Sequence, residues 1–134
     1  MKASNDVIQF LKSDSILDTL LGVTGSNPRI YPLVAPQNQE YPFIVYSIVS
    51  EGTAEEILLE FSMQFSIYDD EYDKVQDIEQ RLKYLLDLQD NINISSTDYR
   101  FEWCKLASSV DLRDEENEAL SMNIIFDFKV IKIT

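Results

Sequence analysis

The stretch Pro28–Ser50 reads PRIYPLVAPQNQEYPFIVYSIVS, and the rest of the chain is organised around it. All four prolines of the protein lie in it, at positions 28, 32, 36 and 42. Each proline fixes its own φ, removes a backbone donor and favours an extended residue before it. The stretch therefore predicts a stiff, non-helical connector that leads directly into a β-strand beginning at Phe43.

Helical spacing marks the two sides of this connector. Before it, apolar residues recur at helical intervals from Val7 to Leu21, and Ser13 and Asp14 favour two short helices there because both residues prefer caps to helix interiors. Further along, an acidic start at residues 69–71 opens one long amphipathic helix. Its apolar stripe comprises Tyr72, Val75, Ile78, Leu82, Leu85 and Leu86.

Four segments have strand patterns. Phe43–Val49 is apolar on both faces, which suggests a central strand or one covered on each side, whereas Leu59–Tyr68 alternates clearly between apolar and polar residues. Tyr99–Leu112 and Ala119–Ile133 are longer β patterns. The expected fold is a single α+β domain over residues 1–134, in the order α-β-β-α-β-β. Its sheet is mostly antiparallel, with about four main strands.

Charge limits the possible partners. The chain has 11 lysines and arginines against 24 aspartates and glutamates, a net charge of −13, and its sequence contains no basic cluster that could follow a phosphate backbone. An acidic surface fits solubility, repulsion of passing nucleic acid, DNA mimicry or a basic partner. No apolar run approaches membrane-spanning length, and one cysteine excludes an intramolecular disulfide. We expect a protein of the reducing cytoplasm, with no membrane partner.

Catalytic and ligand sites are not expected. The sequence has no histidine, no Gly-x-Ser-x-Gly elbow and no phosphate-binding loop. The carboxylates of residues 69–73 could hold a hard cation, but acids at a helix start already have a structural role. Tyr99, Phe101 and Trp103 alternate as if on one strand face and could stack bases, but packing is the better interpretation without nearby cations. The sequence therefore predicts no enzyme, no metal and no cofactor.

Three pieces of the connector carry a family resemblance: Arg-Ile-Tyr-Pro at 29–32, Ala-Pro-Gln at 35–37 and Tyr-Pro-Phe-Ile-Val-Tyr at 41–46. They resemble the start of the tail terminators and tail-to-head joining proteins of long-tailed bacteriophages. The resemblance implies a small α+β subunit of a ring, usually a hexamer, on the head-proximal end of the tail tube. It implies a virion protein at the head-tail junction, whose partners are the tail tube protein and the head connector or head completion protein, with DNA passing through the ring.

The expected interface residues follow from this resemblance and from the acidic loops. Two loops, at 51–56 and 113–118, are predicted to present carboxylates to the lumen or the connector. Connector residues are expected in subunit packing. The residues are Glu51, Glu55, Glu56, Asp114, Glu115, Glu116 and Glu118 for the loops, and Arg29, Tyr31 and Gln37 for the connector. Two alternatives stay open, an acidic DNA mimic that inhibits a nucleic-acid enzyme and a monomeric protein-binding adaptor.

Overall fold

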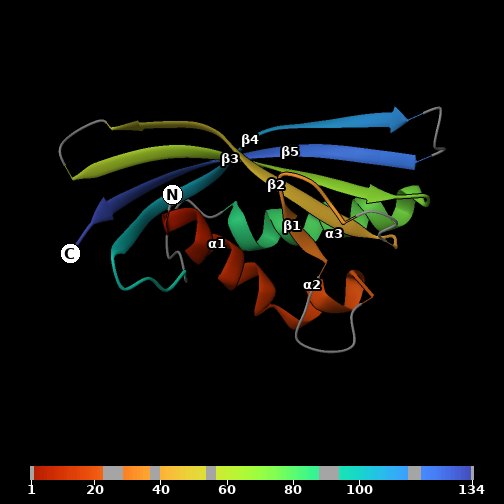
Figure 1. The fold of residues 1–134 in the computed structure, drawn as a ribbon, viewed down its shortest axis with the longest axis horizontal. Helices are drawn as coiled ribbons and strands as arrows, with labels where there is room; N and C mark the ends of the chain where they lie inside the picture. Colours follow the sequence, from red (N-terminus) through yellow and green to blue (C-terminus); the bar gives the residue numbers. More distant parts are fainter. Residues whose placement is uncertain are drawn as a thin grey trace.

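The computed structural model describes residues 2–22, 29–36, 40–53, 57–87, 94–114 and 119–133. Within them the chain forms three helices and a five-stranded sheet in the order β1-β2-β3-β5-β4. The helices lie together on one side of the sheet (Figure 1). The elements in chain order are α1 (Lys2–Lys12), α2 (Ser15–Leu20), β1 (Ile30–Pro32), β2 (Phe43–Thr53), β3 (Leu58–Asp69), α3 (Tyr72–Leu86), β4 (Tyr99–Asp114) and β5 (Ala119–Lys132).

The core lies between the sheet and the helices. Strand alternation supplies one wall, because every second residue of β3 and β5 faces the helices. The α3 stripe supplies the other wall, as its spacing predicts. Phe61 stacks on Phe128 with ring centroids 4.9 Å apart, and Phe65 meets Phe126 edge to face at 6.0 Å. Central side chains of the core are Leu11, Leu17, Ile44, Phe61, Met63, Phe65, Ile67, Ile78, Leu82, Ile124, Phe126 and Phe128.

The predicted division of the N-terminal region is confirmed. The α1 helix ends at Lys12 and α2 begins at Ser15. Asp14 lies between them and caps α2 by accepting a hydrogen bond from the Leu17 N–H at 2.8 Å. The same carboxylate binds Arg81 of α3, so the junction of the two short helices is held against the long one.

The observed sheet differs from the predicted one in two respects. The observed sheet has a fifth strand, β1, inside the proline connector. This strand pairs with β2 in parallel, so the sheet is mixed. Pro32 can belong to an edge strand because it needs no donor there. The Ile44 N–H donates to the Arg29 carbonyl at 2.8 Å, and the Leu33 N–H donates to the Tyr46 carbonyl at 2.9 Å. These bonds bracket the strand without using a proline nitrogen.

The boundaries of the loops also differ from the prediction. Glu51 was expected in a loop, but β2 continues through it to Thr53. A register shift between Ile48 and Ser50 lets the strand continue, because a bulge absorbs one residue. In the same way β4 continues to Asp114, which is paired with Ala119. The two loops are therefore shorter than the sequence suggested.

Candidate interaction surface

The sheet face opposite the helices, called the open face below, is polar at its centre. Within the described part of the chain no helix packs on it (Figure 1). Ser66 donates to Asn123 Oδ1 at 2.7 Å, and Gln64 donates to the Ser66 hydroxyl at 3.3 Å. Ser62 donates to Asp127 Oδ1 at 2.5 Å. Such a satisfied polar face can remain in water or meet another polar surface.

An aromatic cluster lies on the open face where β2 begins. The Phe43 ring stacks on Tyr68 with centroids 5.1 Å apart and on Tyr41 at 5.7 Å, and Tyr31 lies at 6.5 Å from it. Phe43 and Tyr68 are direct cross-strand partners, so sheet register brings their rings together. The cluster anchors the connector to the sheet.

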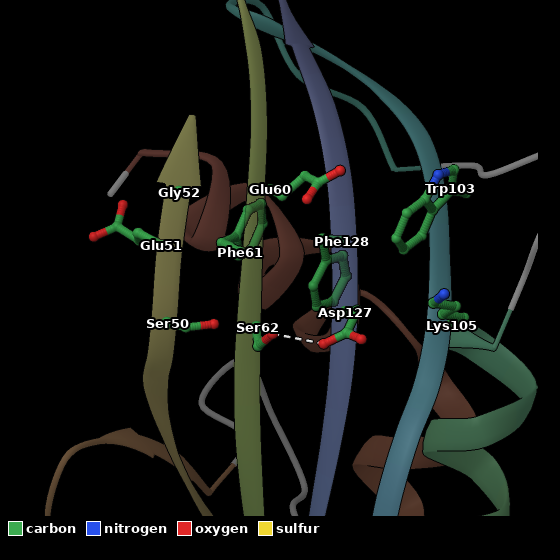
Figure 2. Close-up of a pocket in the computed structure, with 10 residues that line it drawn as sticks. All are labelled: Ser50, Glu51, Gly52, Glu60, Phe61, Ser62, Trp103, Lys105, Asp127 and Phe128. Carbon is green, nitrogen blue, oxygen red and sulfur yellow. Dashed lines mark hydrogen bonds between the residues drawn. The ribbon is translucent and has the colours of Figure 1, made fainter. Parts of the chain in front are cut away.

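A groove of about 460 Å³ crosses the open face nearer the other end of β2. Ser50, Ser62, Asp127 and Lys105 lie in one row across four strands of it (Figure 2). The Lys105 ammonium lies 4.8 Å from the centre of the Trp103 ring, a cation–π contact. The wall residues offer hydroxyls, carboxylates, one ammonium and one indole, a set suited to binding a polar partner surface.

The sequence did not predict most of this groove, and the predicted face of Trp103 relative to Phe101 was wrong. Tyr99, Phe101 and Trp103 were expected on one strand face. A register shift between Phe101 and Trp103 puts Phe101 in the core, with its ring 6.3 Å from Phe128, and Trp103 on the groove. The bulge breaks the alternation that the prediction assumed. A base-stacking row of three aromatic side chains does not exist on this strand.

The strand ends that flank the two acidic segments lie far apart. The strands flanking residues 54–56 and those flanking residues 115–118 end at opposite ends of the sheet (Figure 1). Register agrees, since Leu58 pairs with Ile131 while Asp69 pairs with Leu120. The 12 residues of β3 span about 36 Å between these ends. One contact surface therefore cannot include both pairs of strand ends in the same chain.

The structure places some of the predicted interface residues. Glu51 is exposed, and its side chain points outward from β2, away from β3 (Figure 2). Asp114 ends β4, and its backbone alone is described. Six further residues of the prediction lie outside the described residues: Gln37, Glu55, Glu56, Glu115, Glu116 and Glu118.

Arg29 and Tyr31 make contacts within the chain. Arg29 donates from Nη1 to the Tyr41 carbonyl at 3.0 Å and pairs with Glu40 Oε2 through Nη2 at 3.3 Å. Tyr31 is half-buried beside Phe43. Both side chains hold the connector against the start of β2, a role that the sequence did not predict for them.

Two titratable side chains outside the groove, those of Asp69 and Cys104, are buried. Asp69 is buried where β3 ends, its Oδ2 atom has no hydrogen-bond partner in the described structure, and burial raises its pKa. Burial also raises the pKa of the Cys104 thiol, with the charges of Asp87 and Asp127 adding to the effect. Among the described residues no three acidic or thiol side chains converge as metal ligands. The described helices are all too short or too polar to cross a membrane.

Comparison with known structures adds a likeness of fold. No family model matches the sequence, and no curated protein matches it. The chain shares its fold with a virion protein chain. That chain belongs to the solved structure "Virion of native gene transfer agent (GTA) particle", with a TM-score of 0.69 and 16% sequence identity. The match covers 93% of this chain and 91% of the other, so it includes both the helical layer and the sheet.

Proposed function

We propose that this protein is a structural virion protein that caps the head-proximal end of a phage tail tube and joins the tail to the head connector. It acts as a subunit of a ring, a hexamer in the virion, by shape and surface complementarity. It is not an enzyme and uses no cofactor. Its partners are the tail tube protein and a head completion protein, and it is present in the host cytoplasm until assembly places it at the head-tail junction.

The fold likeness is the observation that carries this proposal. A chain of a gene transfer agent virion has this fold over nearly its full length. The proline-bearing connector independently resembles tail terminators, and the structure gives that connector a defined role as the β1 edge strand. A net charge of −13 adds support, because carboxylates lining a lumen repel DNA and let it pass without sticking.

The separation of the two acidic segments refines the proposal. If the ring axis runs along the strands, one segment belongs to each rim, because the strands leading into them end at opposite ends of the sheet. One rim then meets the tail tube and the other meets the head connector. Charge changes in the two segments should therefore interrupt different steps of assembly.

The experiment that tests the function is negative-stain microscopy with native mass measurement of the purified protein, alone and after mixing with tail tubes of the encoding phage. We expect rings, or a cap on one end of each tube. A protein that stays monomeric and leaves the tubes unchanged contradicts the proposal. That result would favour the adaptor or the DNA-mimic interpretation. A DNA mimic should compete with DNA for a basic protein, whereas an adaptor should not.

Two charge-reversal variants test the assignment of the rims. Glu55→Lys with Glu56→Lys, and Glu115→Lys with Glu116→Lys, each change the charge by the same amount at one segment. We expect one pair to prevent capping of tubes and the other to permit capping but block joining to heads. Asp73→Lys with Asp77→Lys, exposed on α3, is the matched control. Normal phage yield from both charge-reversal variants of the acidic segments would contradict the rim assignment.

A further inference from the structure

Both edges of the sheet are uncovered at the same end. The β1 strand pairs only with Ile44–Tyr46 of β2, so the outer side of β2 from Ile48 to Thr53 has no strand beside it within the described residues. On the opposite edge, β4 pairs only with β5; the Tyr99 N–H donates to the Ser96 hydroxyl at 3.1 Å, and from Arg100 to Lys105 no strand lies on the outer side within the described residues. The β4 residues Tyr99–Lys105 lie across the sheet from this part of β2, as the row Ser50, Ser62, Asp127 and Lys105 shows (Figure 2).

At the other end β1 covers the β2 edge, and side chains of α3 and of the residue after it contact the β4 edge. The Leu106 N–H donates to Asp87 Oδ1 at 3.0 Å, and Ser109 donates to Glu79 Oε2 at 2.7 Å. Tyr72 donates to Asp111 Oδ2 at 2.7 Å. Edge strands of monomers are normally protected, and within the described residues no strand lies beside β2 from Ile48 to Thr53 or beside the outer side of β4 from Arg100 to Lys105, so both segments are open to a partner.

Strand direction allows the two free segments to pair between copies. Each neighbour in the run β2, β3, β5, β4 is antiparallel to the next, so β2 and β4 point in opposite directions. The β2 strand of one copy can therefore lie antiparallel beside β4 of another. The free segments also lie at the same height along the strands. A rotation about an axis parallel to the strands keeps that height, and repeated contacts of this head-to-tail kind form a ring when the rotation closes.

Charge and apolar exposure support the same pairing. Glu51 points outward from the β2 edge, and Val49 beside it is 53% exposed. The free part of β4 carries two exposed cations, Lys105 and Arg100, of which Arg100 pairs with Glu102 at 3.0 Å. A local excess of positive charge is unusual in a chain with 11 cations and 24 acids. The two edges are thus complementary in charge as well as in direction.

We propose that neighbouring copies of this chain join through their sheet edges, with β2 from Ile48 to Thr53 of one copy pairing with β4 from Arg100 to Lys105 of the next. This inference rests on the proposed ring and identifies its subunit contact. The occupant of each free edge is a second copy.

Disulfide trapping tests the contact directly. In a Ser50→Cys and Lys105→Cys double variant, the two cysteines of one copy lie three strand spacings apart, about 14 Å, which is too far for a bond within the copy. After assembly on tail tubes and mild oxidation, a non-reducing gel should show a ladder ending at the closed ring. Val45→Cys with Val110→Cys, in a row of equal width at the covered end, is the matched control and should give no ladder.

The outcomes separate this inference from the proposed function. Rings that form on tubes while the Ser50 and Lys105 cysteines give no ladder would overturn the edge contact and leave the ring intact. Failure of the wild-type protein to form rings would overturn both. A charge swap adds a second readout. Ser50→Lys, which sets a second ammonium opposite Lys105 on the same face, should weaken the contact about fivefold, and Ser50→Lys with Lys105→Glu should restore it. Loss that the double variant does not restore would contradict the pairing.

Discussion

The ion pair between Asp14 and Arg81 joins the two short helices to α3. Arg81 donates from Nε to Asp14 Oδ2 at 2.9 Å and from Nη2 to Oδ1 at 2.6 Å. The side chains of Arg81 and Asp14 are only 18% and 14% exposed. Because Asp14 also caps α2 through the Leu17 N–H, one carboxylate makes two contacts that substitutions can separate.

Asp14→Asn keeps an acceptor for the cap but removes the charge, whereas Asp14→Ala removes both. We expect the free energy of unfolding to fall by about 2 kcal/mol for Asp14→Asn, from the loss of charge-assisted hydrogen bonds. Asp14→Ala should lose about 1 kcal/mol more with the cap, about 3 kcal/mol in all. For a chain of 134 residues, 1 kcal/mol corresponds to about 4 °C in Tm, so Asp14→Ala should melt about 12 °C lower.

The pH dependence gives an independent check. The hydrogen bonds from Arg81, opposed in part by burial, hold the pKa of Asp14 below its usual value. A folded-state pKa below the unfolded one contributes stability that is present above the unfolded pKa, about 3.9, and is lost as the pH falls through the folded value. The stability difference between wild type and Asp14→Asn should therefore be constant from pH 7 to about 5 and shrink below about 4.

Urea unfolding, followed by circular dichroism across this pH series, measures each difference. Equal stability of wild type and Asp14→Asn at pH 7 would refute the reasoning, because the pair would then contribute nothing. A difference that persists unchanged to pH 3 would refute the electrostatic part alone. Equal losses of unfolding free energy for Asp14→Asn and Asp14→Ala would contradict the expected contribution of the α2 cap, about 1 kcal/mol.

Three further predictions concern buried groups. Phe126→Ala should lower the free energy of unfolding by about 4 kcal/mol in a urea titration, far more than Ile125→Ala on the open face, because Phe126 is fully buried. Burial raises the folded-state pKa of Asp69, so wild type should gain stability over Asp69→Asn as the pH falls from 7 to about 4; a flat difference in the same unfolding assay would count against it. Cys104 should react with a thiol reagent only as fast as the chain unfolds, and rapid labelling of the native protein would contradict its burial.

Local patterns predicted the individual elements well. In Leu59–Tyr68 and in Tyr72–Leu86, one side of a single segment faces the core. The spacing of the apolar residues within each segment is therefore enough to predict a strand and a helix. The cap at Asp14 is likewise a local interaction. The proline connector was correctly predicted as non-helical, but its short parallel strand depends on Ile44 and Tyr46 of a later segment. A pattern within the connector cannot report such a pairing.

The candidate surface could not be predicted for the same reason. Ser62, Asp127 and Lys105 come from three strands, and only their register puts them in one row. The bulge that turns Trp103 onto the groove has no signature in an alternating run of aromatic residues. The sequence identified Glu51 as an exposed acid correctly, but it grouped that residue with the 113–118 segment, which the sheet order places at the opposite end.

The sheet order has a consequence for assembly. Because β5 pairs with β3, the apolar strand β5 is central and the more polar β4 becomes an edge. An edge strand of 16 residues invites pairing along its whole length unless it is protected. Asp87 accepts from the Leu106 N–H, Glu79 and Tyr72 contact the side chains of Ser109 and Asp111, and β1 protects β2 at the same end. A protein that functions as a monomer benefits when both edge strands of its sheet are protected. Edge strands that are left open at one end fit the proposal that a second copy pairs with them there.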